Sequence, residues 1–195
     1  MGPNDFIDLD EAMEDRVGVR GSETTDPKRR GPRRGWIVVL VASLVFLVNI
    51  ASPPRLMADV DAVQAQIARR MLASNDWVTA RLDGVAYLEK APLIYWMIAL
   101  SYEIFGIHDW AARLPLAISA VILCWVTYRF ARWAFGEEAG FYAGVSLATS
   151  VGLFLFTRIL IPDAALTLAI TGAIWASLAL LEAEGSHRVG WSAAG

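Results

Sequence analysis

Four long apolar stretches with very few charged side chains constrain the fold of this chain more than any other feature. About 20 apolar residues cross a hydrocarbon core roughly 30 Å thick, so each stretch can cross a bilayer as a helix. Lipid offers no water to unpaired backbone groups, which favours helices over irregular structure. The four predicted transmembrane spans are residues 35–52, 113–131, 139–157 and 163–181.

The composition agrees with a membrane protein. Hydrophobic residues occupy 56% of the 195 positions, which is more than a soluble globular domain of this size carries. Cys124 is the only cysteine, which excludes an intramolecular disulfide and a Cys/His metal site within the chain. We therefore predict an all-α, polytopic membrane protein.

The two ends of the chain are predicted to be tails. Residues 1–34 are acidic and almost free of aromatic side chains, which is typical of disorder. They end in the basic cluster KRRGPRR, and an excess of Lys and Arg marks the cytoplasmic side of a span. We expect a cytoplasmic N-terminus, and a second cytoplasmic tail, truncated, at residues 183–195.

Residues 92–105 decide the predicted topology. This apolar stretch is about 14 residues long, contains Glu103, and is bounded by Pro92 and Gly106. Its length suits a helix lying in the membrane surface better than a span. If it crossed the bilayer, the basic loop after the next span would face outward, against the positive-inside rule.

A flat helix at 92–105 makes residues 53–112 one large external loop. A second amphipathic stretch in this loop predicts another interfacial helix at about residues 60–73. Within the spans, Gly140 and Gly144 form a GxxxG pattern that predicts close helix packing. Arg113 flanks the second span, and we expect its side chain to extend toward the headgroups.

The polar residues that hydropathy leaves unexplained all fall on the external side of this topology: Asp59, Asp61, Glu89, Lys90, Arg158 and Asp163. Lys90 is notable because 15 of the 17 basic residues are arginines. A compact ammonium binds phosphate as a point charge, and a nearby Asp can act as general base. The set predicts a site for a charged headgroup carried on a lipid tail.

Each of these residues also has a plain structural interpretation. Asp59 or Asp163 can cap a helix, and Glu89 with Lys90 can form a solvated pair in a turn. Arg158 can extend from the end of a span. Residue type and position alone leave these alternatives open.

Several motifs together carry a resemblance to a known family. The segments IARRML, SNDWVTARLDG, YLEKAPLIYW, WAARLP and FTRILIPD, in this order, resemble the ArnT-like, protein-mannosyltransferase-like membrane glycosyltransferases of the GT-C fold. The resemblance covers residues 59–181. It implies the N-terminal module of that fold, with four transmembrane helices and interfacial helices in the first external loop.

The resemblance also implies a chemistry. The family takes a sugar from a polyprenyl-phosphate donor at the outer membrane face and transfers it to a lipid, glycan or protein acceptor. Lys90 matches the lysine that binds the lipid phosphate, and we expect Arg158 to assist it. Asp59 or Asp61 corresponds to the catalytic base, and Asp163 to a second acidic residue near the site. Glu89 matches a position linked to a divalent metal in some members, so no cofactor is a firm expectation.

Two departures limit what the resemblance implies. The family's loop carries adjacent Asp and Glu residues, whereas here Val60 separates Asp59 from Asp61. Relatives also have more spans and a C-terminal domain, so we expect the chain to need a missing half, from a longer product or a second chain. The alternative is a non-catalytic protein that binds polyprenyl phosphate or pairs with another chain. A multi-pass protein of the inner (plasma) membrane is expected, with no nucleic-acid partner.

Overall fold

The computed structural model describes residues 34–48, 50–51 and 59–192, with side chains described as far as Glu182. These residues fall in one compact unit, Arg33–Gly195. The tail predicted at the N-terminus lies outside the described residues, apart from Arg34. At the other end, residues 183–192 continue the last helix rather than forming a separate tail.

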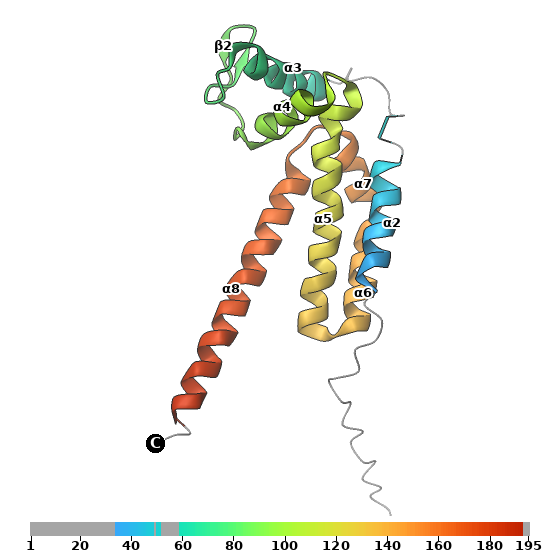
Figure 1. The fold of residues 1–195 in the computed structure, drawn as a ribbon, viewed down its shortest axis with the longest axis vertical. Helices are drawn as coiled ribbons and strands as arrows, with labels where there is room; N and C mark the ends of the chain where they lie inside the picture. The colour runs from blue at the N-terminus through green and yellow to red at the C-terminus, as the bar shows by residue number, and fades with distance from the viewer. Residues whose placement is uncertain (1–33, 49, 52–58, 193–195) are drawn as a thin grey trace, which may run out of the picture. The chain divides into compact units, whose positions relative to one another are not determined.

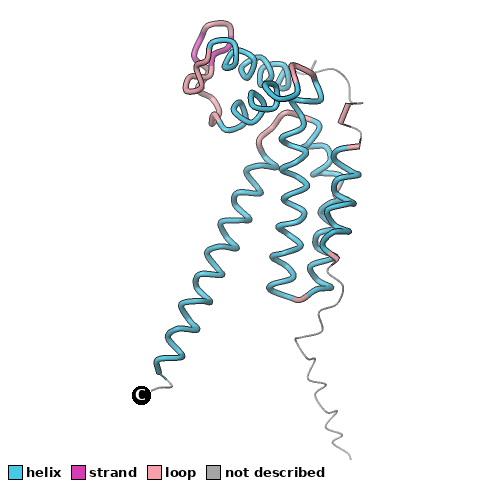
Figure 2. Tube along the Cα trace, in the orientation of Figure 1, coloured by secondary structure: helices cyan, strands magenta, loops and turns pink. Residues whose placement is uncertain are grey.

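The chain is built almost entirely of helices, which confirms the predicted all-α class. Helices α2, α5, α6 and α7 run beside one another, α8 diverges from α5, and α3 and α4 lie across one end (Figure 1). One short hairpin, which the sequence analysis did not anticipate, projects from that end (Figure 2). The elements are α2 Gly35–Leu47, α3 Asp59–Ser74, β1 Arg81–Leu82, β2 Val85–Ala86, α4 Leu93–Phe105, α5 Asp109–Phe135, α6 Glu137–Ala148, α7 Val151–Arg158 and α8 Asp163–Ser192.

Two helices are long and apolar enough to cross a membrane, namely α5 and the part of α8 up to Glu182. The stretch 139–157, predicted as one span, is formed by two helices, α6 and α7, which together are long and apolar enough to cross a membrane but are bent by 47°. Thr149 Oγ1 donates to the carbonyl of Val145 at 2.9 Å, and this type of side-chain bond bends helices. Helix α2 has 13 residues, so the count of four spans stays a prediction.

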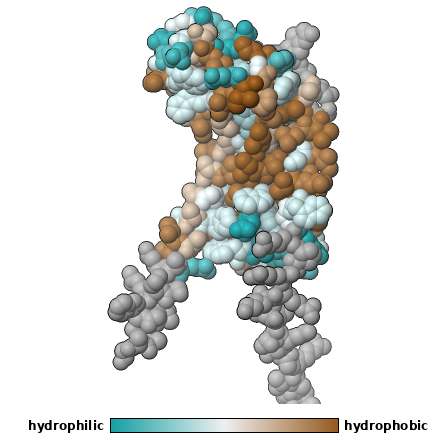
Figure 3. Space-filling view, in the orientation of Figure 1, coloured by the Kyte–Doolittle hydropathy of each residue, from teal (hydrophilic) through white to brown (hydrophobic). Residues whose placement is uncertain are grey.

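Apolar side chains form a broad band over the lengthwise helices, below a more hydrophilic α3–α4 end (Figure 3). At the opposite end, Glu137 ties three elements together. Its carboxylate accepts from the Tyr128 hydroxyl at 2.9 Å and from the Arg34 backbone N–H at 3.2 Å, and it pairs with Arg132 at 2.6 Å. The start of α2 and the α5–α6 corner therefore lie at the same end of the helices.

The GxxxG pattern packs α6 tightly against its neighbours, as the sequence predicted. A Cβ atom on Gly140 would lie 2.8 Å from the Tyr128 carbonyl oxygen of α5. A Cβ atom on Gly144 would lie 2.7 Å from a methyl group of Val38 on α2. Only glycine allows this approach of three helices.

Helix α4 is amphipathic and lies between two different surroundings. One face, which includes Ile94 and Ile98, is buried against α3 and α5. The other face exposes a row of large apolar side chains: Leu93, Trp96, Leu100 and Ile104. A short helix with one apolar face exposed fits a position in the membrane surface.

Candidate functional site

The site begins with Asp61, which lies on the buried face of α3. Its side chain is only 4% exposed, and its Oδ1 atom accepts the backbone N–H of Leu160 at 2.8 Å. Its Oδ2 atom lies 3.6 Å from Nη2 of Arg113, whose side chain is also buried. A buried carboxylate held this way connects α3, α5 and the loop before α8.

Arg113 does not extend toward the headgroups, so that expectation was wrong. The guanidinium is held inward because Asp61 offers it a counter-charge in the protein interior. Its Nε–H also donates to the carbonyl of Arg158 at 3.2 Å. Asp61 and Arg113 thus form hydrogen bonds to the backbone on both sides of Ile159, and these bonds fix the loop that joins α7 to α8.

That loop carries two of the sequence-predicted residues. The guanidinium of Arg158 lies 4.6 Å from the ring centroid of Phe154, so its orientation is set within α7. Asp163 is the first residue of α8, directly after Pro162, and it is exposed. Asp59 opens α3, but its side chain lies outside the described residues.

Lys90 lies in a bend directly before α4 and is half-buried. Within the described residues its ammonium has no hydrogen bond or ion pair, so the solvated Glu89–Lys90 pair is not formed. The next residue, Ala91, lines an apolar cavity of about 180 Å³ between α4, α5 and α8. Pro162 lines the same cavity, so Lys90 and Asp163 each adjoin a lining residue in the sequence, although neither of them lines the cavity itself.

Glu89 is engaged with a neighbour of its own. Its carboxylate accepts the hydroxyl of Tyr87, and this hydrogen bond raises the pKa of Tyr87. Among the described residues, no three His, Cys, Asp or Glu side chains gather in a way that could hold a metal ion. These residues therefore give Glu89 no co-ligands for a divalent metal, and its metal role stays a prediction.

The DW and YW motifs meet in space. Trp96 donates its indole N–H to the carbonyl of Trp77 at 2.6 Å, which ties α4 to the loop after α3. Asp76 shapes that loop, because its carboxylate accepts the backbone N–H groups of Thr79 and Val78, both at 3.1 Å. These bonds lower the pKa of Asp76. The motifs therefore fix the position of the segment that leads to Lys90.

The hairpin in this segment was missed, although its signal is present in the sequence. Asp83 and Gly84 both adopt positive φ angles, 50° and 88°, between the paired strands β1 and β2. An Asp-Gly pair is a strong indicator of such a turn. The partnership of Asp61 with Arg113 had no comparable local signal, because 52 positions separate the two residues.

Comparison with known proteins agrees with this architecture. Residues 89–195, more than half of the chain, match the model of the dolichyl-phosphate-mannose-protein mannosyltransferase family. The chain belongs to this family. The matched residues include the EKAP and RILIPD segments, and each segment contributes to the wall of the apolar cavity.

Individual members of the wider group are also similar. The chain is 36% identical over 116 residues to the undecaprenyl phosphate-alpha-4-amino-4-deoxy-L-arabinose arabinosyl transferase 1 of Pseudomonas fluorescens, covering 60% of this chain and 20% of that protein. The crystal structure of ArnT from Cupriavidus metallidurans bound to undecaprenyl phosphate superimposes with a TM-score of 0.65 at 31% identity. That match covers 71% of this chain and 26% of the crystallised one.

These matches confirm the GT-C membrane fold. They also show how much of the relatives' length this chain covers. The chain spans about a fifth of the length of the curated relatives it matches.

Proposed function

We propose that this chain forms the donor-phosphate site of a glycosyltransferase that takes a sugar from a polyprenyl-phosphate carrier. The observation that carries the proposal is that Lys90 directly precedes Ala91, which lines the apolar cavity. A long isoprenoid tail needs an apolar wall, and its phosphate needs a cation at the end of that wall. The arrangement at the start of α4 supplies both.

Lys90 suits this role because no described side chain neutralises its charge. An ammonium with three donors can follow a phosphodiester as it becomes a phosphate monoester. Arg158, at the end of α7, is the proposed second cation. Its backbone is held by Arg113, so its side chain starts from a fixed position.

The proposed reaction breaks one bond and forms another at the anomeric carbon. A carboxylate removes the proton from an acceptor hydroxyl or amine, whose lone pair attacks that carbon. The bond from the carbon to the donor phosphate oxygen then breaks, and the lipid phosphate leaves with the electron pair. Lys90 and Arg158 stabilise the charge that develops on this leaving phosphate.

The structure favours some carboxylates over others for the base. Asp61 is buried and already bound to Arg113 and to the Leu160 N–H, so we assign it to positioning the loop. Asp163 is exposed and directly follows Pro162, which lines the cavity, and Asp59 opens α3 on the same external layer. We propose Asp59 or Asp163 as the group that accepts the proton.

The cellular setting follows from the same proposal. We propose a multi-pass inner-membrane protein with its N-terminus in the cytoplasm and with α3 and α4 at the outer face. The acceptor is a lipid, glycan or protein. The relative from Pseudomonas fluorescens is named for a 4-amino-4-deoxy-L-arabinose carried on undecaprenyl phosphate, which makes that donor the first one to test.

Binding of polyprenyl phosphate without transfer is the second candidate function. The cavity and Lys90 suffice for binding, and all of their parts lie within the described residues. Helix α8 also leaves room for a second chain, because only 6% of its apolar window is buried. Release of undecaprenyl phosphate from the sugar donor, measured with the purified chain, separates the two candidates.

The decisive experiment is a titration of the purified chain, in nanodiscs, with undecaprenyl phosphate. We expect saturable binding that weakens at least about tenfold in Lys90→Ala, since a hydrogen bond to a charged group contributes about 1.5–3 kcal/mol. Lys90→Arg should retain part of the affinity. Equal binding by wild type and Lys90→Ala, or no binding by either, contradicts the proposal.

Arg81→Ala is the matched control. Arg81 is an exposed cation on β1 in the same external layer, and it lies 3.7 Å from Asp76. Its loss changes the net charge as Lys90→Ala does but touches no wall of the cavity. Undiminished binding in this variant shows that the effect at Lys90 is local.

A further inference from the structure

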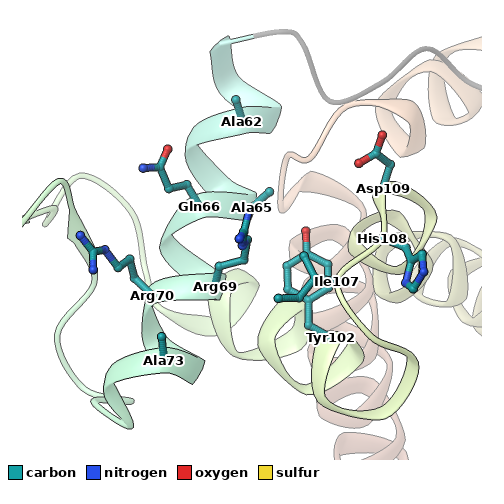
Figure 4. Close-up of a pocket in the computed structure, with 10 residues that line it drawn as sticks. All are labelled: Ala62, Ala65, Gln66, Arg69, Arg70, Ala73, Tyr102, Ile107, His108 and Asp109. Atoms are coloured by element: carbon teal, nitrogen blue, oxygen red, sulfur yellow. The ribbon is translucent and has the colours of Figure 1, made fainter.

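A second cleft, of about 630 Å³, lies at the opposite end of α4 (Figure 4). It shares no lining residue with the apolar cavity beside Lys90. With a rise of 1.5 Å per residue, the two ends of α4 are about 18 Å apart. The proposed function makes no use of this cleft.

The charges around the cleft are unbalanced. Arg69 and Arg70, both exposed, border it from α3, and Asp109 is the only carboxylate in its wall. Neither guanidinium forms an ion pair with a carboxylate of the described residues. Two cations that face one carboxylate leave the cleft with an excess of positive charge.

A tyrosine hydroxyl also faces this space. Tyr102 is 4% exposed as a residue, lines the cleft, and points its hydroxyl between α3 and Asp109 (Figure 4). This hydroxyl has no hydrogen-bond partner among the described residues, and solvent reaches it from the cleft. Burial of the ring, with a smaller contribution from Asp109, raises the pKa of Tyr102 to about 12. The hydroxyl can therefore donate to a ligand that enters the cleft.

A tight turn and a buried hydrogen bond fix the wall of the cleft opposite α3. Gly106, with a φ of 81°, ends α4 and turns the chain so that His108 and Asp109 border the cleft. Ser101 donates to the carbonyl of Ala111 at 2.6 Å in the interior and so fixes the corner between α4 and α5. The cleft thus has a defined shape before any ligand enters.

The cleft also adjoins the apolar face of α4. The exposed row on this helix ends at Ile104, and exposed Phe105 and Ile107 continue it to the cleft. If this row rests in the bilayer surface, the cleft opens at the depth of the lipid phosphates. Arginine binds phosphate oxygens in a bidentate manner, which suits such a headgroup.

We propose that this cleft is a second anion site, which binds a phosphate-bearing headgroup through Arg69 and Arg70, with the Tyr102 hydroxyl and His108 as further contacts. The proposal is independent of transfer at the Lys90 end. Its ligand class is a phosphate mono- or diester, from a membrane lipid or as a free phosphate.

The test measures binding of dihexanoyl-phosphatidylglycerol to the full chain in zwitterionic nanodiscs, with inorganic phosphate as competitor. We expect the Arg69→Gln/Arg70→Gln double variant to weaken binding at least about tenfold. Tyr102→Phe, which keeps the buried ring, should weaken it about threefold. Competition by inorganic phosphate identifies a free-phosphate site, and failure to compete identifies a lipid headgroup.

A matched control keeps this proposal separate from the first. Arg81→Gln removes an exposed cation that borders neither cavity. It should bind the probe as wild type does. Unchanged binding in the double arginine variant, or an equal loss in Arg81→Gln, overturns the second site and leaves the donor site untouched.

Discussion

The two ends of helix α4 present different surroundings to the membrane surface. At its start, Lys90 precedes Ala91, which lines a narrow cavity of aliphatic side chains between α4, α5 and α8. At its end, Arg69 and Arg70 border a wider cleft lined largely by polar groups. An apolar wall is suited to a hydrocarbon tail, whereas a polar one is suited to a charged headgroup. Under the two proposals, one helix separates recognition of a lipid tail from recognition of surface charge.

The largest expected effect comes from the pair that holds the first end together. Asp61→Ala removes a buried counter-charge of Arg113 and the acceptor of the Leu160 N–H. We expect it to lower the free energy of unfolding by about 3 kcal/mol, because breaking a buried ion pair leaves a desolvated charge. Thermal unfolding in nanodiscs measures this. Glu103→Ala, at an exposed carboxylate within helix α4, should change it by less than about 0.5 kcal/mol.

Asp61→Asn sharpens the comparison between the ends at a smaller loss of stability. The amide keeps the side-chain shape but not the charge, so the loop between α7 and α8 should loosen. We expect weaker binding of undecaprenyl phosphate at the Lys90 end and unchanged binding of dihexanoyl-phosphatidylglycerol at the other. Equal weakening of both ligands contradicts the assignment of this pair to one end.

Filling the apolar cavity should have an intermediate effect. Ala165 lines the cavity from α8, and Ala165→Trp occupies space that we assign to the isoprenoid tail. We expect about tenfold weaker binding of undecaprenyl phosphate, since each buried methylene contributes about 0.8 kcal/mol. Titration in nanodiscs checks this. Ala173→Trp, at an exposed position on the same helix, should leave the affinity as it was.

The smallest effect on stability is expected from spin labels at exposed positions, one of them in the middle of α4. In a Cys124→Ala background, a spin label at Leu100→Cys should meet lipid-soluble oxygen, because Leu100 lies in the exposed apolar row. A label at Gln66→Cys, on the wall of the polar cleft, should meet a water-soluble relaxant instead. A water-exposed label at Leu100 would show that the row does not rest in the bilayer.

Much of the architecture could be predicted from the sequence because apolar length and charge distribution act locally. They indicated helices, including a short one near residues 92–105, and the close packing at Gly140 and Gly144. They did not indicate the bend near Thr149, since an apolar window counts a kinked pair as one stretch. Hydropathy averaged over a window carries no information on the hydrogen bond from one threonine to its own helix.

The surroundings of the candidate site residues could not be predicted from the sequence. The sequence analysis named Asp61 and Lys90 together, yet one is buried in an ion pair and the other stands without a partner among the described residues. The difference depends on Arg113, whose contact with Asp61 arises only when α3 folds over α5. The sequence analysis treated Arg69 and Arg70 only as part of the IARRML motif. No local sequence pattern shows that Tyr102 lines the same cleft.

The hydrogen bond between Asp61 and Leu160 also sets a minimum time for the assembly of this protein during synthesis. The two residues are 99 positions apart. At roughly 5–20 residues per second, the ribosome delivers Leu160 about 5–20 s after Asp61. Until then α3 has an acidic side chain without its final backbone donor, so the outer layer is completed only after α5, α6 and α7 have been synthesised.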